Sequence, residues 1–192
     1  CSLAVSTLTT RFVFPQFSLE GTRLWVLGMA PLGLEKVVVQ KWVQAFLGIG
    51  LLTTMLQLVS GVMLGQSTSD ILFYTASVGL MSMGLCGIAV GLGALFPNLE
   101  EQNAAKIVSG FGGTLCLICS FLYILCAIAS LSIAKTALFR AGERGGSLLS
   151  GPEGAMGAAL LLMVGVTAVF GGLPMWGAIR RARKFEFRGP LG

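Results

Sequence analysis

Four long stretches of the chain contain no charged side chain and are rich in apolar residues. They cover residues 42–65, 71–96, 107–134 and 154–179, and each is 24 to 28 residues long. Because an α-helix rises about 1.5 Å per residue, about 20 apolar residues suffice to cross the hydrocarbon core of a membrane. The apolar runs are continuous and do not alternate with polar residues, which favours helices over barrel strands. The pattern therefore predicts four full transmembrane helices.

The first ten residues are apolar or hydroxylated, and Arg11 follows them. A helix of ten residues is too short to cross a membrane. Since the chain begins with Cys1 and not with Met, we interpret residues 1–10 as the end of a fifth span whose beginning precedes Cys1. A lipidated Cys1 is the less favoured alternative, because a lipid anchor adds little to four spans. The predicted fold is an all-α integral membrane protein, a polytopic helical bundle forming one transmembrane domain over residues 1–192.

The composition agrees with this class. Of the 192 residues, 55% are hydrophobic and 11% are charged, whereas about 25% of a soluble protein is charged. Disordered chains are polar and highly charged, so disorder is excluded. The sequence contains no His, which excludes His-based catalysis and His metal sites.

The distribution of Lys and Arg predicts the orientation. Residues 11–41, 97–106 and 180–192 share one side of a four-span protein and carry ten of the 13 basic side chains. By the positive-inside rule this side is cytoplasmic, so we expect a multi-pass membrane protein with a cytoplasmic C-terminus. We read the net charge of +5 as a topology signal and expect no nucleic acid as a partner, because the basic tail directly follows a span.

Residues 11–41 form the least ordinary cytoplasmic segment. Pro15 ends any helix that leaves the membrane, and Ser18 suits an N-cap with Glu20 in the first turn. Glu20 and Arg23 can pair across one turn of a short apolar helix that contains Trp25 and ends at Pro31. A helix from there to residue 65 would be about 52 Å long, so its start should protrude or lie at the interface. The segment is either a surface anchor or a docking element.

Residues 97–106 form a short polar connection between two spans. Pro97 stops the second span, and Asn98 can cap the next helical turn. Glu100, Glu101 and Lys106 are expected to face the cytoplasm. Such a loop is an ordinary helix connection, or it is a contact surface for an ATPase.

Glycines at helical spacing are expected at packing faces or hinges of the spans. The pairs Gly61/Gly65 and Gly87/Gly91 follow the GxxxG pattern, which lets helix backbones approach closely. The run with Gly110, Gly112 and Gly113 predicts a flexible or kinked third span. This run is no phosphate loop, since the pattern GxxxxGK[ST] is absent from the sequence.

Catalytic and metal sites are not expected. Cys116, Cys119 and Cys126 share roughly one helix face, but a fourth ligand is lacking, so we interpret them as small buried residues. No ionisable group other than Cys or Tyr lies within a predicted span, which argues against ion-coupled transport and against an intramembrane hydrolase.

Two long motifs carry a resemblance to a known family. The stretches FPQFSLEGTRLWVLGMAPLGLEKVVVQKW and GLGALFPNLEEQNAAKIVSGFGGTL, followed by RRARKFEF, resemble the C-terminal half of a bacterial ABC exporter permease family over about residues 10–188. The first motif maps on Phe14, Pro15, Ser18, Leu19, Glu20, Gly21, Trp25, Leu27, Ala30 and Pro31. The second maps on Gly91, Gly93, Phe96, Pro97, Glu101, Asn103, Ala105, Lys106, Ile107, Ser109, Gly110, Gly112, Gly113 and Thr114. The chain departs from the pattern at Thr22-Arg23 and at Ala104.

The resemblance implies a permease subunit that is not itself an enzyme and that couples ATP hydrolysis on a separate ABC ATPase to substrate movement. ATP and Mg would bind to that partner and no cofactor to this chain. Membrane lipids and a second permease or permease half are the other expected partners, and the implied location is the bacterial inner membrane. The implied ATPase-coupling residues are Ser18, Glu20, Arg23, Trp25, Pro31, Pro97, Asn98, Glu100, Glu101, Asn103 and Lys106.

Two other functions stay open at this point. The glycine-rich packing faces suit a non-transporting membrane scaffold or assembly subunit equally well. A membrane-embedded lipid-modifying enzyme is the less favoured reading, because such enzymes need acids, His or a metal near the interface.

Overall fold

The computed structural model describes residues 2–20, 34–97, 103–143 and 152–187. Every regular element in these ranges is a helix, so the predicted all-α fold is confirmed. In chain order the elements are α1 (Ser2–Leu8), η1 (Thr9–Val13), α2 (Gln16–Glu20), α4 (Leu34–Ala45), η3 (Phe46–Gly50), α5 (Leu51–Met63), α6 (Thr68–Leu95), α7 (Ala104–Ser109), α8 (Phe111–Glu143) and α9 (Pro152–Phe187). The two η elements are π-helical turns.

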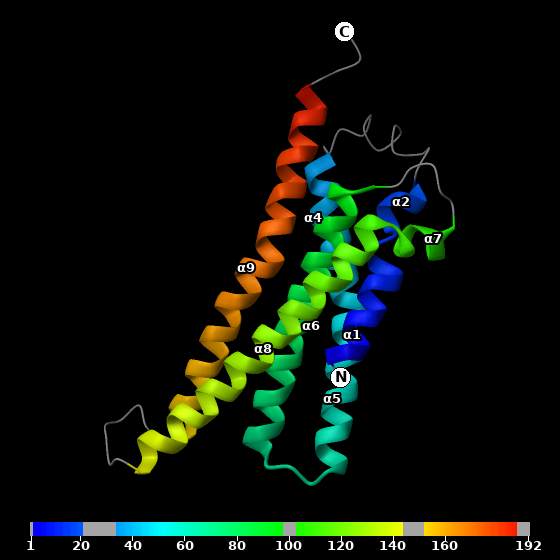
Figure 1. Cartoon of the computed structure of the whole chain (residues 1–192). Helices are drawn as coiled ribbons and strands as arrows, with labels where there is room; N and C mark the ends of the chain where they lie inside the picture. The colour runs from blue at the N-terminus through cyan, green and yellow to red at the C-terminus, as the bar shows by residue number, and fades with distance from the viewer. Residues whose placement is uncertain (1, 21–33, 98–102, 144–151, 188–192) are drawn as a thin grey trace.

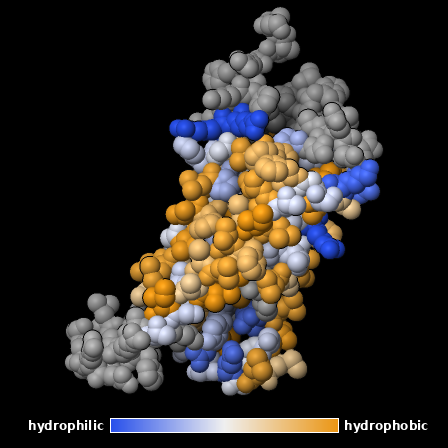
Figure 2. All heavy atoms as spheres, in the orientation of Figure 1, coloured by the Kyte–Doolittle hydropathy of each residue, from blue (hydrophilic) through white to orange (hydrophobic). Residues whose placement is uncertain are grey.

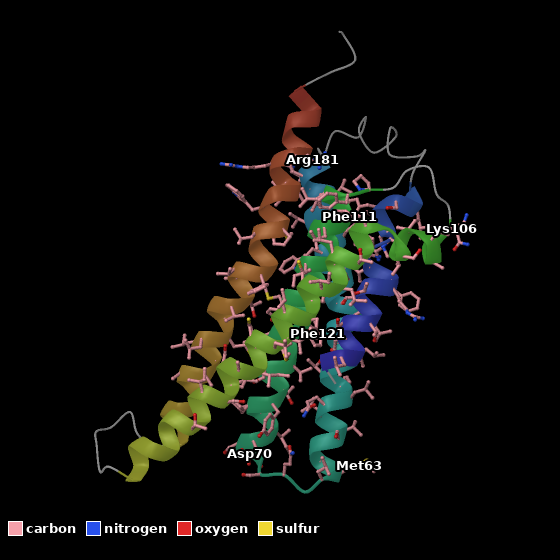
Figure 3. The ribbon with its side chains drawn as sticks, viewed as in Figure 1. Met63, Asp70, Lys106, Phe111, Phe121 and Arg181 are labelled. Carbon is pink, nitrogen blue, oxygen red and sulfur yellow. The ribbon has the colours of Figure 1, made fainter. Side chains whose placement is uncertain are left out.

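Four helices are long and apolar enough to cross a membrane, as the sequence predicts. They cover Glu35–Met63, Thr68–Leu95, Phe111–Ile133 and Gly157–Arg181. On the face shown in Figure 2 an apolar band covers the middle of the bundle, and hydrophilic residues lie toward its two ends. Met63 and Asp70 lie at one end of this band, Lys106, Phe111 and Arg181 lie at the other, and Phe121 lies between them (Figure 3).

The helix α6 is the core of the bundle. In its most apolar window 67% of the residues are buried, against 17–28% in the other three spans. Because α6 packs against α5, α8 and α9, it has almost no amphipathic periodicity and is apolar on all sides. The other spans keep one face toward the surroundings, where the exposed side chains include Leu52, Phe121 and Leu161.

The chain passes through the bundle four times in alternating directions (Figure 1). The start of α4, the α6–α8 connection with α7, and the end of α9 therefore lie at one end of the bundle, which we call the basic end. The α5–α6 turn and the start of α9 lie at the opposite end. At the opposite end the acidic side chain of Asp70 lies in the first turn of α6. The Lys and Arg side chains that the structure describes are Arg11, Lys36, Lys41, Lys106, Arg180 and Arg181. The side of the membrane that each end faces stays a prediction.

The N-terminal helix continues beyond the ten residues expected from the sequence. Together α1 and η1 run to Val13, and they pack against α6 and α8. Val5 and Val13 are buried in the common core of the bundle. The N-terminal segment is thus an integral part of the helix packing.

Two helix ends differ from the sequence expectation. The helix of the first span begins at Leu34 and ends with Gly65 at φ 63, where the amide N–H groups of Gly65 and Gln66 donate to the carbonyls of Val62 and Gly61 at 3.1 and 3.2 Å. This pattern is a Schellman cap, which favours glycine because of its positive φ. The third span begins at Phe111 and not at residue 107, because the extended Gly110 separates it from α7.

Candidate functional site at the basic end of the bundle

Phe14 joins the two sequence motifs at the basic end. Its side chain is 1% exposed. A Cβ atom at Gly93 of α6 would lie 2.6 Å from the Phe14 carbonyl oxygen, and a Cβ atom at Gly112 of α8 would lie 3.0 Å from Cζ of the Phe14 ring and 3.1 Å from Cβ of Phe96. The two glycines therefore make the room in which Phe14 sits. We call Phe14, Gly93, Phe96 and Gly112 the Phe14 junction.

The short helix α2 follows this junction and packs toward α4. Phe17 and Ser18 are buried, and the Lys41 ammonium group lies 5.0 Å above the centre of the Phe17 ring. A cation over an aromatic face is attracted by the ring quadrupole, so this contact holds α2 near α4. Ser18 lies inside α2, which begins at Gln16, and is therefore not the N-cap that the sequence suggested.

The helix α7 lies before the third span and is held by a cap and an anchor. The Asn103 side-chain oxygen accepts a hydrogen bond from the Ala105 amide at 3.0 Å, which is a typical N-cap interaction. Ile107 is buried in the core, while Lys106 in the last turn is exposed. The helix thus presents a cation at the basic end while its apolar side stays fixed.

Arginine side chains close the same end on α9. The Arg181 guanidinium donates a 2.8 Å hydrogen bond to the Leu95 carbonyl at the end of α6. A cation at a helix C-terminus satisfies an orphan carbonyl and complements the helix dipole. The neighbouring Arg180 guanidinium lies 3.6 Å from the centre of the Trp176 ring. The Arg181 hydrogen bond therefore ties α9 to the end of α6, whereas the Arg180–Trp176 contact lies within α9.

The sequence-derived coupling residues are only partly gathered at this site. Pro97 and Asn103 are exposed on either side of the α6–α7 connection, and Lys106 lies on α7. Glu20 ends α2, but its side chain lies outside the described part of the structure. Arg23, Trp25, Pro31, Asn98, Glu100 and Glu101 lie outside the described residues. The coupling role of these residues stays a prediction.

The glycines expected at packing faces lie at several kinds of place. Gly87 lies against Gly171 of α9, and Gly91 lies against the Pro174 backbone. Gly61 contacts the Ile71 side chain, and Gly65 caps α5. Gly110 separates α7 from α8, Gly112 contacts Phe14, and Gly113 lies against the Val108 backbone.

The interactions with the greatest structural effect at this end were missed by sequence reasoning. Phe14 was noted only as part of a motif, because its contacts with Gly93 and Gly112 join residues far apart in the sequence. The Arg181–Leu95 contact has no signal in the sequence, because its acceptor is a backbone carbonyl. Among the residues that the structure describes, no three His, Cys, Asp or Glu side chains could hold a metal ion.

A hydroxyl pair connects the spans further inside the bundle. The Tyr123 and Thr167 hydroxyl oxygens lie 2.8 Å apart, linking α8 to α9. Both side chains are buried. A Cβ atom at Gly84 of α6 would lie 2.5 Å from the Tyr123 hydroxyl oxygen, so the tyrosine also depends on a glycine of the central helix.

Removal of this hydrogen bond should have a small, measurable effect. Hydrogen bonds between membrane helices contribute about 0.6 kcal/mol on average and at most about 1.7 kcal/mol. We therefore expect Tyr123→Phe to lower the free energy of unfolding in detergent by about 0.6 kcal/mol. In a double-mutant cycle, Tyr123→Phe and Thr167→Val should show coupling of this size. Purely additive effects would contradict a direct bond.

Comparison with known proteins gives one match. A family model described as "Putative ATP-binding cassette" matches residues 1–187, nearly the whole chain. No curated protein and no solved structure matches the chain.

The family match corrects three expectations from the sequence. The matching family is described as an ATP-binding cassette, so the assignment to a permease family is wrong. The function inferred from it, a permease subunit served by a separate ATPase, is wrong for the same reason, as is the expectation that the chain is no enzyme, because ATP-binding cassettes hydrolyse ATP. The family match also gives no support to the two alternative functions, a membrane scaffold and a lipid-modifying enzyme. The expectation of a permease rested on the two long motifs, on the apolar spans and on the absent GxxxxGK[ST] pattern, and such local features do not determine the family of the full-length chain.

Proposed function

The chain belongs to the putative ATP-binding cassette family, and we propose that it is the membrane-embedded helical part of an ATP-hydrolysing cassette system. The observation that carries this proposal is the coincidence of a family match over residues 1–187 with four helices that could cross a membrane. Neither the family match nor the set of apolar helices suffices alone, because a fold does not determine a function.

We further propose that the basic end is where ATP-driven movement reaches the spans. Three features support this assignment. The Phe14 junction joins the end of η1 to α6 and α8. The helix α7 carries an exposed Lys106 before a helix break at Gly110, and Arg181 ties α9 to α6. A displacement of α7 or α2 would therefore be passed to the spans through close-packed contacts, since packed interfaces shift between discrete arrangements. ATP and Mg are assigned to the cassette of the assembled protein.

ATP turnover by the assembled protein tests this proposal. The protein is isolated from its native membrane in mild detergent and placed in lipid nanodiscs, and Mg-dependent phosphate release from ATP is measured. We expect turnover that falls several-fold in Lys106→Glu, because the charge at the proposed contact surface is reversed. The matched control is Asp70→Lys, a charge reversal at the opposite end, which should leave turnover unchanged.

Two outcomes would contradict the proposal. A preparation that enters nanodiscs and releases no phosphate from ATP has no cassette activity. Equal losses of ATP turnover in Lys106→Glu and Asp70→Lys would show that the basic end has no special role in turnover. The subunit composition of the same preparation also tests the expected ABC ATPase partner and the expected second copy.

A further inference from the structure

Two of the spans contain an irregular turn. The first span includes the π-helical turn η3 (Phe46–Gly50), and α9 has Pro174 inside its helix. Pro174 has no amide hydrogen to donate to the Phe170 carbonyl, and the pair Gly171 and Gly172 shortly precedes it. Prolines, glycine pairs and π-helical turns are the places where long helices bend. Each of these two spans therefore has a defined point at which it can bend.

Contacts with the central helix α6 place the two irregular turns at the same level of the bundle. A Cβ atom at Gly50 of η3 would lie 3.3 Å from the Ser82 hydroxyl oxygen, and a Cβ atom at Gly171 would lie 3.3 Å from Cα of Gly84. Ser82 and Gly84 are two residues apart on α6, about 3 Å along the helix axis. The helix α6 itself is a continuous α-helix over Thr68–Leu95. It therefore forms an axis against which both neighbouring spans can bend.

The part of α9 before the bend is held firmly by α8 and α6. The Thr167 hydroxyl oxygen lies 2.8 Å from the Tyr123 hydroxyl oxygen of α8, and the ring centres of Tyr123 and Phe170 lie 5.9 Å apart. On the α6 side, a Cβ atom at Gly87 would lie 3.1 Å from Cα of Gly171. Because backbone meets backbone here, this part of α9 has no room to move toward α6.

Beyond the irregular turns, toward the basic end, side-chain hydrogen bonds link both spans to α6. The Trp42 indole N–H of α4 donates to the Met83 carbonyl at 3.4 Å, and the Arg181 guanidinium of α9 donates to the Leu95 carbonyl at 2.8 Å. Such bonds can break and form again when a helix moves, because the side chains rotate. The helices α4 and α9 also pack against each other. A displacement of one of them is therefore passed to the other.

An apolar space lies beside the bend of α9. It measures about 390 Å³ between α4, α6 and α9, and its lining includes Trp42 and Gly172. A Cβ atom at Gly172 would meet nothing within 4 Å, so no backbone blocks α9 on this side. The side toward α6 is closed, because a Cβ atom at Gly91 would lie 2.6 Å from the Pro174 carbonyl carbon. The end of α9 can therefore bend into this space and not toward α6.

We propose that α4 and the part of α9 beyond Pro174 swing together against α6, bending at η3 and at residues 171–174. Trp42 and Arg181 act as latches that favour the position seen in the structure, because their hydrogen bonds must break when the pair moves. Hinges in proteins are a few residues that absorb a change in the backbone angles. The inference rests on the proposed function for what drives the swing, whereas the swing itself needs no ATP.

Distances between spin labels in the assembled protein test the swing in nanodiscs without nucleotide, in a background that lacks the native cysteines. One label stays at exposed Ile118 of α8. The second label is placed at Gln40 on α4, at Arg180 beyond the bend of α9, or at Leu161 before the bend, all of which are exposed. We expect two distances for Gln40 and for Arg180 and a single distance for Leu161. A single distance for Gln40 or for Arg180 would overturn the paired swing.

Variants at the bend provide the second arm. Pro174→Ala keeps the Cβ atom beside Gly91 and restores the missing amide hydrogen, so the Arg180 label should report a single distance. Gly172→Leu fills the apolar space and should have the same effect. Gly165 is equally open but does not line the space, so the matched control Gly165→Leu should keep both distances. Two distances that persist in Pro174→Ala and in Gly172→Leu would contradict the bend.

Removal of a latch should change the balance between the two positions. Arg181→Met loses the hydrogen bond to Leu95 and should change the ratio of the two Arg180 distances about threefold, as expected for one interhelical hydrogen bond. An unchanged ratio would show that Arg181 is no latch. Phosphate release from ATP is measured separately on the same preparation, so a protein that swings and releases no phosphate contradicts the proposed function and not the swing.

Discussion

Phe14→Ala is expected to lower the free energy of unfolding by about 3 kcal/mol. The Phe14 side chain is 1% exposed and fills the space between Gly93, Phe96 and Gly112. A buried Phe→Ala change in a water-soluble core costs about 3–5 kcal/mol, part of which is the transfer of the ring from water. In a membrane bundle the packing loss dominates, so we expect the lower end of that range.

The matched control for this prediction lies two residues earlier, in η1. Phe12 is 66% exposed, so Phe12→Ala should change the free energy of unfolding by less than about 0.5 kcal/mol. Denaturant unfolding in mixed micelles, followed by circular dichroism, measures both variants. Similar losses in the two variants would show that Phe14 is no junction between the helices.

Gly91→Leu should destabilise the bundle by about 3 kcal/mol or more, because it separates α6 from α9. A Cβ atom at Gly91 would lie 2.6 Å from the Pro174 carbonyl carbon and 2.8 Å from the Met175 amide nitrogen. Backbone atoms cannot rotate away as a flexible side chain can, so the helices must move apart.

Gly48→Leu is the control for Gly91→Leu. A Cβ atom at Gly48 would meet nothing within 4 Å, so this variant adds the same side chain in open space. Thermal unfolding in detergent should show a marked loss of stability for Gly91→Leu and little change for Gly48→Leu. A Gly91→Leu protein as stable as Gly48→Leu would contradict close packing of α6 on α9.

The spans were predictable because a membrane imposes a simple rule on sequence. Charges are costly in hydrocarbon, so each charge-free run falls on one of the four helices, although the helices extend up to nine residues beyond the runs. The central place of α6 was not predictable in this way. Its hydropathy resembles that of the other spans, and what distinguishes it is burial against three neighbours.

The ends of the helices were harder to predict because short local interactions set them. Gly65 fits a GxxxG pair by spacing, yet its positive φ makes it a helix cap. Gly110 lies inside a charge-free run, yet its extended backbone ends α7 before the span begins. In both cases a backbone conformation overrides the pattern of side chains.

The candidate site was only partly predictable. Asn103 and Lys106 were selected as polar residues of a connection, and the structure places both on or beside α7. The contacts of Phe14 with Gly93 and Gly112 join residues far apart in the sequence, and neither composition nor spacing reports such a meeting. The family also could not be predicted from short motifs, because the family match extends over residues 1–187.

The central claim is that ATP drives movement at the basic end of a membrane-embedded bundle. Its most direct test is an electron spin resonance distance measurement on the assembled protein in nanodiscs, in a background whose five cysteines are replaced by serine. One label pair, at exposed Leu19 and Ala105, reports on α2 and α7 and keeps Lys106, and a second pair, at Met63 and Leu72, reports on the opposite end. We predict that ATP with Mg and vanadate changes the first distance and leaves the second unchanged. An unchanged first distance in a preparation that hydrolyses ATP would contradict the account.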